Sequence, residues 1–185
     1  MIRFVDFKLA LGEKVVENEV IENEAGWERG QVKLKTGINV RFTSSQSSEY
    51  LAFEAIKKIK SNEWTREVDL VISVTNTPTI NFPNFSNYAH SFLNLRKDCK
   101  CLGLNSGCTG FVEALELVNF YFQNGYKKAL IITYDTYTNF LSKSDYSTRT
   151  LFSDGASVSL LEKDNNQWKI ELSKISTASN SQNDL

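Results

Sequence analysis

The sequence predicts an α/β fold with a mainly parallel central sheet and helices on both of its faces. Two short β-branched runs, 68–75 and 129–134, have the apolar composition of strands that are buried on both faces. Between them lies an amphipathic helical pattern that stops at Asn124-Gly125, where glycine accepts a left-handed conformation. Strands that alternate with helices at this spacing are typical of a covered parallel sheet.

The length and composition are those of one globular domain or of one large piece of a domain. The chain has 185 residues, of which 41% are hydrophobic and 23% are charged, and its net charge is -1. This length allows a sizeable core. The sequence has no basic stripe or RNA-binding motif, and we expect no nucleic-acid partner. It has no run of 18 apolar residues and no charged-then-apolar leader, so we expect neither a membrane span nor a secretory signal.

The cysteines indicate a reducing environment. Cys99, Cys101 and Cys108 are an odd number without the spacing of a disulfide framework, which predicts a cytoplasmic location. Together with His90, the only histidine, Cys99 and Cys101 make a poor metal-ligand set, because no second pair follows at zinc-like spacing. We therefore expect no metal site.

The amino-terminal part of the chain predicts a mixture of strands and helices. Alternation predicts a strand over 2–11, and the acidic stretch 13–30 has room for a short helix. A turn at 35–38 is expected to lead into an extended or irregular piece. A polar cluster before Ser48 can cap a helix that runs to about Ile59. The apolar face of that helix comprises Leu51, Ala52, Ala55, Ile56 and Ile59.

The rest of the chain continues the alternation. Pro78 and Pro83 cannot continue a strand ladder, so the segment that contains them is expected to be a loop. The expected elements are, in order, a loop at 76–84, a helix at 87–95, strands at 102–104 and 129–134, a polar loop at 135–150, a strand at 151–161 interrupted by Asp154-Gly155, a strand at 167–175, and a polar end at 177–185.

The residues around Cys108 suit a nucleophile. Cys108 lies between Gly107 and Thr109-Gly110, where the helix that stops near Gly125 begins. A thiol there feels the positive end of the helix dipole and unpaired N–H groups, which favour the nucleophilic thiolate. The flanking glycines leave room for a substrate carbonyl, with the Cys108 N–H as one oxyanion donor. The same residues also suit a small buried hydrophobe at a strand-to-helix turn, and the local sequence leaves both interpretations open.

Four motifs occur in a recognisable order between residues 35 and 160. They are Lys35-Thr36-Gly37-Ile38 with Arg41; Thr77-Pro78 with Phe82-Pro83-Asn84; Asn105-Ser106-Gly107-Cys108-Thr109-Gly110-Phe111; and Arg149-Thr150-Leu151-Phe152-Ser153-Asp154-Gly155-Ala156. Together they resemble the β-ketoacyl-(acyl carrier protein) synthase III family of thiolase-fold condensing enzymes. The resemblance implies that residues 1–185 form one amino-terminal thiolase-like half.

The resemblance also implies an acyltransferase that needs no cofactor. Cys108 would take an acyl group from an acyl-CoA or acyl-ACP thioester, and a malonyl thioester would condense with it after losing carbon dioxide. Such a reaction belongs either to fatty acid biosynthesis or to specialised metabolism.

Three further residues match substrate-binding positions of the family. Phe82 would reach across a dimer interface into the neighbour's acyl pocket, although it also suits an ordinary apolar anchor. Lys35 stands where the family often has an arginine that faces the coenzyme A phosphates, and it also suits a solvated surface charge. Arg149 opens the fourth motif, and Asp154 is expected to brace the turn.

The sequence also departs from the family. The family's catalytic His and Asn lie in a second half, which we expect to be absent because no histidine follows Cys108. His90 precedes Cys108 and is expected to be a surface or packing residue. Tyr146 stands where the family often has an arginine, and Trp27 lies farther from Thr36-Gly37 than the family's adenine-stacking tryptophan.

Two functions remain open. One is a synthase whose active site a second half completes; the other is a non-catalytic thiolase-like subunit that forms a complex or binds acyl carrier protein. In both cases we expect a homodimer or a complex with a second-half subunit, because unpaired strand edges and uncovered apolar faces invite association. A nucleotide-binding domain is disfavoured because no glycine-rich phosphate loop follows a strand, and a hydrolase because no histidine follows Cys108.

Overall fold

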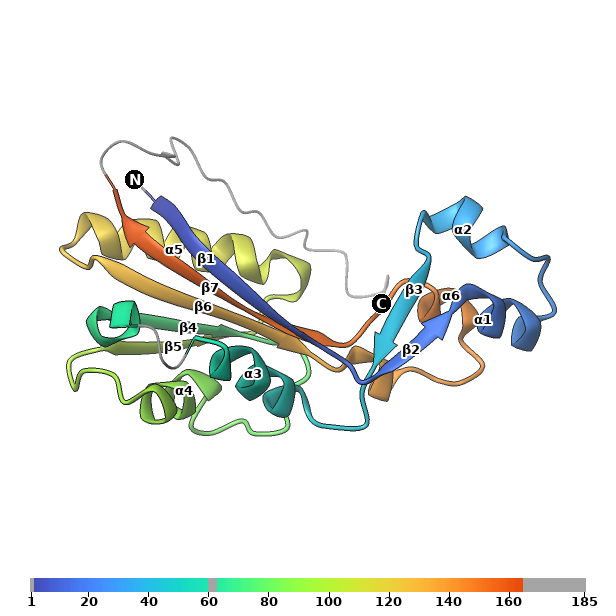
Figure 1. The fold of residues 1–185 in the computed structure, drawn as a ribbon, viewed down its shortest axis with the longest axis horizontal. Coiled ribbons are helices and arrows are strands. Elements are labelled where there is room, and N and C mark those ends of the chain that lie inside the picture. The colour runs from blue at the N-terminus through green and yellow to red at the C-terminus, as the bar shows by residue number, and fades with distance from the viewer. Residues whose placement is uncertain (1, 60–62, 165–185) are drawn as a thin grey trace, which may run out of the picture.

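A computed structural model describes residues 2–59 and 63–164 of the chain. Its centre is a five-stranded sheet in the order β1-β7-β6-β4-β5 (Figure 1). β4 is parallel to β5 and β6, whereas β7 is antiparallel to both β6 and β1. β7 alone is therefore reversed, and the sheet is mainly parallel, as predicted. The strands are β1 (Ile2–Leu11), β4 (Leu70–Val74), β5 (Lys100–Leu104), β6 (Lys128–Asp135) and β7 (Gly155–Lys163).

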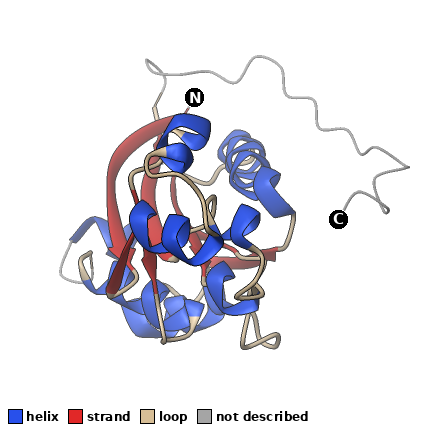
Figure 2. Ribbon diagram, turned by 90° about the vertical axis from the view of Figure 1, so that its right-hand side faces the viewer, coloured by secondary structure: helices blue, strands red, loops and turns tan. Residues whose placement is uncertain are grey.

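Helices cover both faces of this sheet, which confirms the predicted α/β, thiolase-like architecture (Figures 1 and 2). On one face, α3 (Ser48–Lys57) and α4 (Phe85–Leu93) bury their apolar side chains against β4, β6 and β7. On the other face, α5 (Gly110–Gln123) packs on β4 and β6. Every residue of β4 is buried, as its continuous apolar run predicts for a strand with helices on both sides.

A smaller region lies beyond the carboxyl-terminal edge of the sheet (Figure 1). It pairs β2 (Lys14–Glu17) with β3 (Val40–Thr43) in an antiparallel ribbon and adds α1 (Asn18–Ala25) and α2 (Gln31–Thr36). The stretch 13–30 therefore holds the expected short helix and also a strand that the sequence did not predict. The described elements also include three short 3-10 helices and the short α6 (Tyr146–Arg149). The 3-10 helices are η1 (Glu63–Glu67), η2 (Gly107–Thr109) and η3 (Tyr137–Phe140).

The turn predicted at 35–38 was wrong for Lys35 and Thr36, which end α2, whereas the extended piece predicted to follow it is confirmed as β3. The buried Glu22 carboxylate accepts hydrogen bonds from the N–H groups of Gly30 (3.0 Å) and Val32 (2.9 Å) at the start of α2. It satisfies backbone donors that a side chain at the cap would otherwise bind. Gly37, with φ of 74°, ends the helix. A cap that comes from another helix leaves no local signal in the sequence.

Several predicted boundaries also shift. The polar loop 135–150 contains η3 and α6, and β7 begins at Gly155 rather than at residue 151. The Asp154 carboxylate accepts hydrogen bonds from Ser44 N (2.8 Å) and Thr138 N (3.0 Å), so it braces the turn as expected and delays the start of the strand. The strand predicted at 167–175 and the polar end at 177–185 lie outside the described residues.

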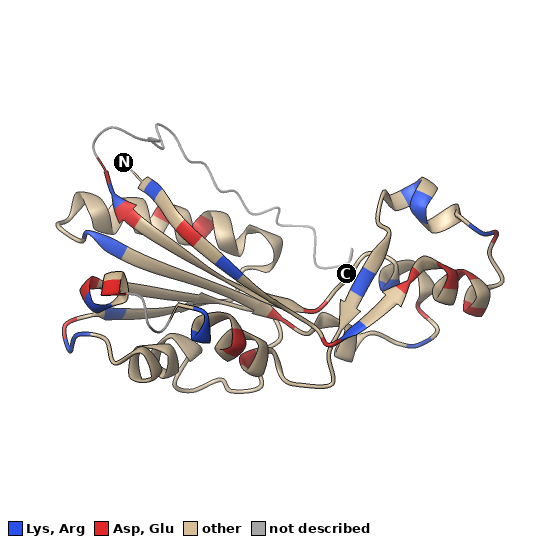
Figure 3. Cartoon of the chain, in the orientation of Figure 1, with Lys and Arg blue, Asp and Glu red and all other residues tan. Residues whose placement is uncertain are grey.

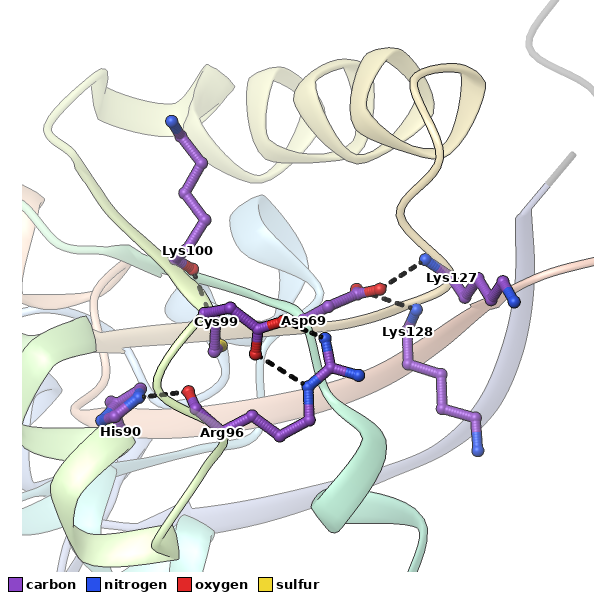
Figure 4. A network of polar contacts seen from close by, with 8 residues as sticks. Asp69, His90, Arg96, Cys99, Lys100, Lys127 and Lys128 are labelled. Carbon is purple, nitrogen blue, oxygen red and sulfur yellow. Dashed lines mark hydrogen bonds and ion pairs between the residues drawn. The ribbon is translucent and has the colours of Figure 1, made fainter.

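Two aspartates join β4 to β6, one at each end of the pair. At the amino-terminal end, the buried Asp69 carboxylate accepts hydrogen bonds from Lys127 N (2.8 Å) and Lys128 N (3.1 Å) (Figure 4). At the other end lies Asp135, the last residue of β6.

No helix in the described part of the chain is long and apolar enough to cross a membrane.

Candidate active site

Cys108 lies in η2, immediately before α5, and its side chain is exposed. It therefore occupies the predicted strand-to-helix turn, but not as a buried hydrophobe. Gly107 before it has φ of 58°, a left-handed conformation that glycine adopts without strain. A Cβ on Gly110 would lie 2.5 Å from Val74 Cγ1, so only glycine lets the first turn of α5 approach β4 this closely.

A hollow of about 350 Å³ opens beside Cys108 at the carboxyl-terminal edge of the sheet. The parallel strands β4, β5 and β6 all end at this edge, where open α/β sheets usually bind their ligands. The apolar residues Val74 and Phe111 line part of the hollow, and the polar lining includes Asn76, Thr133, Asp135 and Ser157. The Thr133 and Ser157 hydroxyl oxygens are 2.7 Å apart and hydrogen-bonded to each other.

The Asp135 carboxylate organises the loop that follows β4. Its Oδ1 accepts hydrogen bonds from Thr75 Oγ1 (3.0 Å), Asn76 N (2.8 Å) and both the backbone N (3.0 Å) and Oγ1 (2.8 Å) of Thr77. The side chain of Asn76 then links this loop to the cysteine turn, because its Oδ1 accepts a hydrogen bond from Gly107 N at 2.9 Å.

Glu49 of α3 holds the next part of the same loop. Its buried carboxylate accepts hydrogen bonds from Thr79 N (2.8 Å), Ile80 N (3.2 Å) and the Thr79 hydroxyl. Burial opposes the charged form, but these hydrogen bonds outweigh it and lower the pKa of Glu49 below its ordinary value. The loop that carries Phe82 is thus fixed by two carboxylates on its way from β4 to α4.

A further carboxylate lies on the first turn of α5. Glu113 Oε1 is 2.8 Å from the Thr109 hydroxyl, which also lies 2.7 Å from the carbonyl oxygen of Ser106. Hydrogen bonds from the side chains of Ser106 and Thr109 lower the pKa of Glu113. A negative charge at this helix start is stabilised by the dipole of α5.

The four predicted site residues do not come together. Phe82 is 92% exposed on the loop between β4 and α4. Lys35 belongs to α2, which lies at the far end of the molecule from α5 (Figure 1) and carries basic residues opposite the acidic α1 (Figure 3). Arg149 belongs to α6 and lines a separate cavity of about 60 Å³. Only Cys108 reaches the hollow at the edge of the sheet.

The Arg149 side chain contacts several residues around it. It forms an ion pair with Glu24 (2.8 Å) and donates a hydrogen bond to the carbonyl oxygen of Lys143 (2.6 Å). Its guanidinium lies 5.5 Å from the centre of the Tyr146 ring, and that ring meets Trp27 edge-on at 6.3 Å. Tyr146, which stands where the family often has an arginine, therefore lies between Arg149 and Trp27.

The other two cysteines form a pair at the opposite end of β5. Their mutual interaction lowers the pKa of Cys101 and raises the pKa of Cys99, whose Sγ lies 3.9 Å from the carbonyl oxygen of Lys100. His90 also lowers the pKa of Cys101, and its Nε2 lies 2.8 Å from the carbonyl oxygen of Arg96. Within residues 2–59 and 63–164, no group of three or more potential metal ligands occurs.

Sequence reasoning missed Asn76 and Asp135, which border the same hollow as Cys108. The available signal was their place directly after the two predicted buried strands. Because parallel strands end at the same edge of a sheet, polar residues after each of them are brought together. The network of hydrogen bonds among them depends on tertiary structure and has no local sequence pattern.

The match to a family model covers residues 102–179 and describes a 3-oxoacyl-[acyl-carrier-protein (ACP)] synthase III. The chain is 28% identical over 162 residues to a β-ketoacyl-[acyl-carrier-protein] synthase III of Rickettsia typhi, covering 85% of this chain and 51% of that protein. Its Rickettsia bellii counterpart is 30% identical over 164 residues, with coverage of 85% and 51%.

The chain is also similar to a solved structure of a protein with that name. The crystal structure of a 3-oxoacyl-(acyl-carrier-protein) synthase III superposes with a TM-score of 0.82 at 29% identity, and the match covers 90% of this chain and 51% of that one. These similarities confirm the resemblance that the four motifs predicted. The chain spans about half the length of the relatives that it matches.

Proposed function

We propose, from the premise that this chain is a relative of β-ketoacyl-ACP synthase III, that it is the acyl-accepting half of a condensing enzyme. The observation that carries the proposal is the exposed Cys108 at the start of α5, beside a hollow at the carboxyl-terminal edge of the sheet. A nucleophile needs this combination of access, nearby backbone donors and room for a bound acyl group.

In the proposed reaction, the Cys108 thiolate attacks the carbonyl carbon of an acyl-CoA or acyl-ACP. A new carbon–sulfur bond forms, the old thioester bond breaks, and the CoA or carrier thiolate leaves. A malonyl thioester then loses carbon dioxide, and its carbanion displaces Cys108 to give a β-ketoacyl thioester. The Cys108 N–H is the proposed oxyanion donor, because the Gly107 N–H already donates to Asn76.

A second half that carries His and Asn would complete this site. Support comes from apolar side chains on β1: Phe7, Leu9 and Leu11 are 59%, 46% and 49% exposed. Phe7 and Leu9 pair with Ser159 and Ser157, which line the hollow beside Cys108, so the apolar row continues the same face of the sheet. Exposed apolar surface of this kind marks an interaction site. We place the docking of the second half there, with this chain as a single domain.

The predicted substrate contacts are part of the proposal. The exposed side chain of Phe82 suits insertion into a neighbouring subunit of a homodimer. Arg149 and Lys35 would contact the coenzyme A or carrier phosphates from the smaller region, in a cytoplasmic setting that the three free cysteines favour. Phosphate contact by Arg149 would require exchange of its ion pair with Glu24.

The test is covalent labelling of the purified chain with acetyl-CoA and with acetyl-ACP, followed by peptide mass spectrometry. We expect an added acetyl group on the Cys108 peptide in the wild type and in a Cys101→Ala control, and none in Cys108→Ala. Acetylation that persists in Cys108→Ala, or that falls on Cys101 instead, would contradict the assignment.

A non-catalytic thiolase-like subunit is the second candidate, because the described residues that line the hollow beside Cys108 include no histidine. To separate the two, the tagged chain is purified gently from its own host and all associated chains are weighed. A partner whose addition allows labelling of Cys108 and formation of a β-ketoacyl product supports the enzyme. A complex in which Cys108 takes no acyl group supports the non-catalytic subunit.

A further inference from the structure

We propose that Asp135 is a positioning residue for Cys108 and that it acts through the side chain of Asn76. The link runs from the end of β6, through the loop after β4, to the turn before α5. What the positioned cysteine does rests on the proposed function, whereas the link itself rests on hydrogen bonds that can be tested without any acyl substrate.

The first step is the set of hydrogen bonds by which the Asp135 carboxylate holds the loop after β4. A single carboxylate oxygen, Oδ1, accepts from the backbone N–H groups of Asn76 and Thr77 and from the hydroxyls of Thr75 and Thr77. Hydrogen bonds to an ionised acceptor are shorter and stronger than neutral ones. The Thr77 hydroxyl in turn accepts from Thr136 N at 3.0 Å, which ties the loop back to the residue after β6.

The second step is the orientation of the Asn76 amide. Gly107 N can only donate, so the carbonyl oxygen Oδ1 of Asn76 must face it, at 2.9 Å. The Nδ2 group then points toward Asp135 Oδ2, at 3.5 Å. Both ends of the amide are thereby assigned by their partners, and one side chain connects the carboxylate to the cysteine turn.

The third step is the effect on Cys108. Gly107 is the residue before it and adopts a left-handed conformation, which sets the direction in which the chain enters η2. On the other side of Cys108, Gly110 packs against Val74 of β4. The turn is therefore fixed at both of its ends by residues from one segment, Val74 and Asn76. Without the Asn76 contact, the Gly107 end of the turn loses its hydrogen bond to the segment that follows β4.

Asp69 provides a matched control at the other end of β4. It also accepts two backbone N–H groups next to β6, those of Lys127 and Lys128, but its contacts lead away from Cys108. Loss of Asp69 should weaken the sheet without releasing the cysteine turn. A change that appears in Asp135 variants but not in Asp69 variants cannot be attributed to general destabilisation.

The experiment measures the rate at which iodoacetamide alkylates Cys108 in the folded protein, followed on its own peptide by mass spectrometry. The proteins are wild type, Asp135→Ala, Asn76→Ala, the double variant and Asp69→Ala, with Asp135→Asn and Asp69→Asn as milder versions in case an alanine variant does not fold. We expect the alkylation rate of Cys108 to fall at least about threefold in Asp135→Ala and in Asn76→Ala. Without the hydrogen bond to Gly107 N, the turn shifts and the thiolate loses its stabilisation by the backbone N–H groups of η2 and α5.

If Asp135 acts through Asn76, the double variant reacts as slowly as Asn76→Ala alone, and the Asp69 variants stay close to wild type. The backbone amide proton of Gly107 should lose its hydrogen-bonded chemical shift in the Asp135 and Asn76 variants only. Three results would overturn the proposal. The first is a double variant whose alkylation rate falls by the product of the two single effects, and the second is an equal fall in rate in the Asp69 variants. The third is an unchanged chemical shift of the Gly107 amide proton in the Asp135 and Asn76 variants. A failure of acetyl-CoA to label wild-type Cys108 would overturn the proposed function but not this link.

Discussion

At each end of the β4–β6 pair, an aspartate accepts hydrogen bonds from backbone N–H groups, but the two aspartates hold different segments. At the amino-terminal end, Asp69 precedes β4 and accepts two backbone N–H groups where β6 begins. At the carboxyl-terminal end, Asp135 closes β6 and accepts two backbone N–H groups and two hydroxyls of the loop after β4. Each aspartate thus joins its own strand to the segment that flanks the other.

The difference lies in what the bound segment does next. The contacts of Asp69 stay within the backbone at the start of the strands, and its side chain is buried. The loop bound by Asp135 borders the hollow and extends one amide, that of Asn76, to the turn that carries Cys108. The contacts of Asp135 therefore extend, through the Asn76 side chain, to the turn of the proposed nucleophile, whereas those of Asp69 do not.

The largest expected effect on stability is at the Asp69 end. Asp69→Ala leaves the N–H groups of Lys127 and Lys128 without their acceptor in a buried place. Each such group costs about 1–3 kcal/mol, so the free energy of unfolding should fall by about 3 kcal/mol in a urea titration. Asp135→Ala should cost about half as much, because water in the hollow can replace the carboxylate. An equal or larger loss in Asp135→Ala would contradict this contrast.

The next effect concerns the glycines at the two ends of α5. Gly110→Ala places a methyl group 2.5 Å from Val74 Cγ1, and overpacking of this kind costs about 1–3 kcal/mol. The methyl group should also displace the first turn of α5 and slow the alkylation of Cys108.

Gly125→Ala is the control at the far end of α5. Gly125 has φ of 100° with open space around it, so the cost there is backbone strain of about 1–2 kcal/mol. Both variants should lower the urea midpoint, but only Gly110→Ala should change the reactivity of Cys108. A changed reactivity in Gly125→Ala would show that α5 transmits strain along its whole length.

A smaller effect depends on pH and again concerns the loop at the Cys108 end. Because the folded-state pKa of Glu49 is lowered from 4.5, its charged form stabilises the fold above that pH. This contribution is lost as the pH falls through the lowered folded-state value. The stability advantage of the wild type over Glu49→Gln should therefore be constant at neutral pH and shrink below about pH 4.5. A pH-independent difference between the two unfolding curves would refute this role.

The smallest expected effect is at Arg149, away from both ends of the β4–β6 pair. Its ion pair with Glu24 is partly exposed, and exposed pairs contribute about 0–1 kcal/mol. Arg149→Met should therefore change the urea midpoint little and leave the alkylation of Cys108 at its wild-type rate. If Arg149 binds the acyl donor, the variant should instead need more acetyl-CoA for half-maximal labelling, whereas the surface control Lys143→Met should not.

The sequence predicted those parts of the molecule that depend on local pattern. The buried runs of β4 and β6, the amphipathic α5 and its end before Asn124-Gly125 follow from periodicity and from glycine conformation. Helix α2 was missed because its start is capped by the distant Glu22. Asn76 and Asp135 were missed for the same reason, since residues 59 positions apart meet only in the folded sheet.

The family resemblance found Cys108 and gave roles to Phe82, Lys35 and Arg149 that stay predictions. The structure separates these three residues from the hollow, so their proposed roles depend on substrate or on a second subunit. In this chain, the turn that carries Cys108 is where the sequence pattern and the fold agree, and its role as a nucleophile stays a prediction.

The most direct test of the account is the time course of acetyl transfer from acetyl-CoA to Cys108 in wild type, Asp69→Asn and Asp135→Asn. If the Asp135 end holds a nucleophile and the Asp69 end is purely structural, wild type and Asp69→Asn acquire the acetyl group at similar rates. Asp135→Asn should be about tenfold slower, because small displacements of a reacting group have effects of this size or larger. Equal slowing in both variants, or no acetyl group on Cys108 in any of the three proteins, would contradict it.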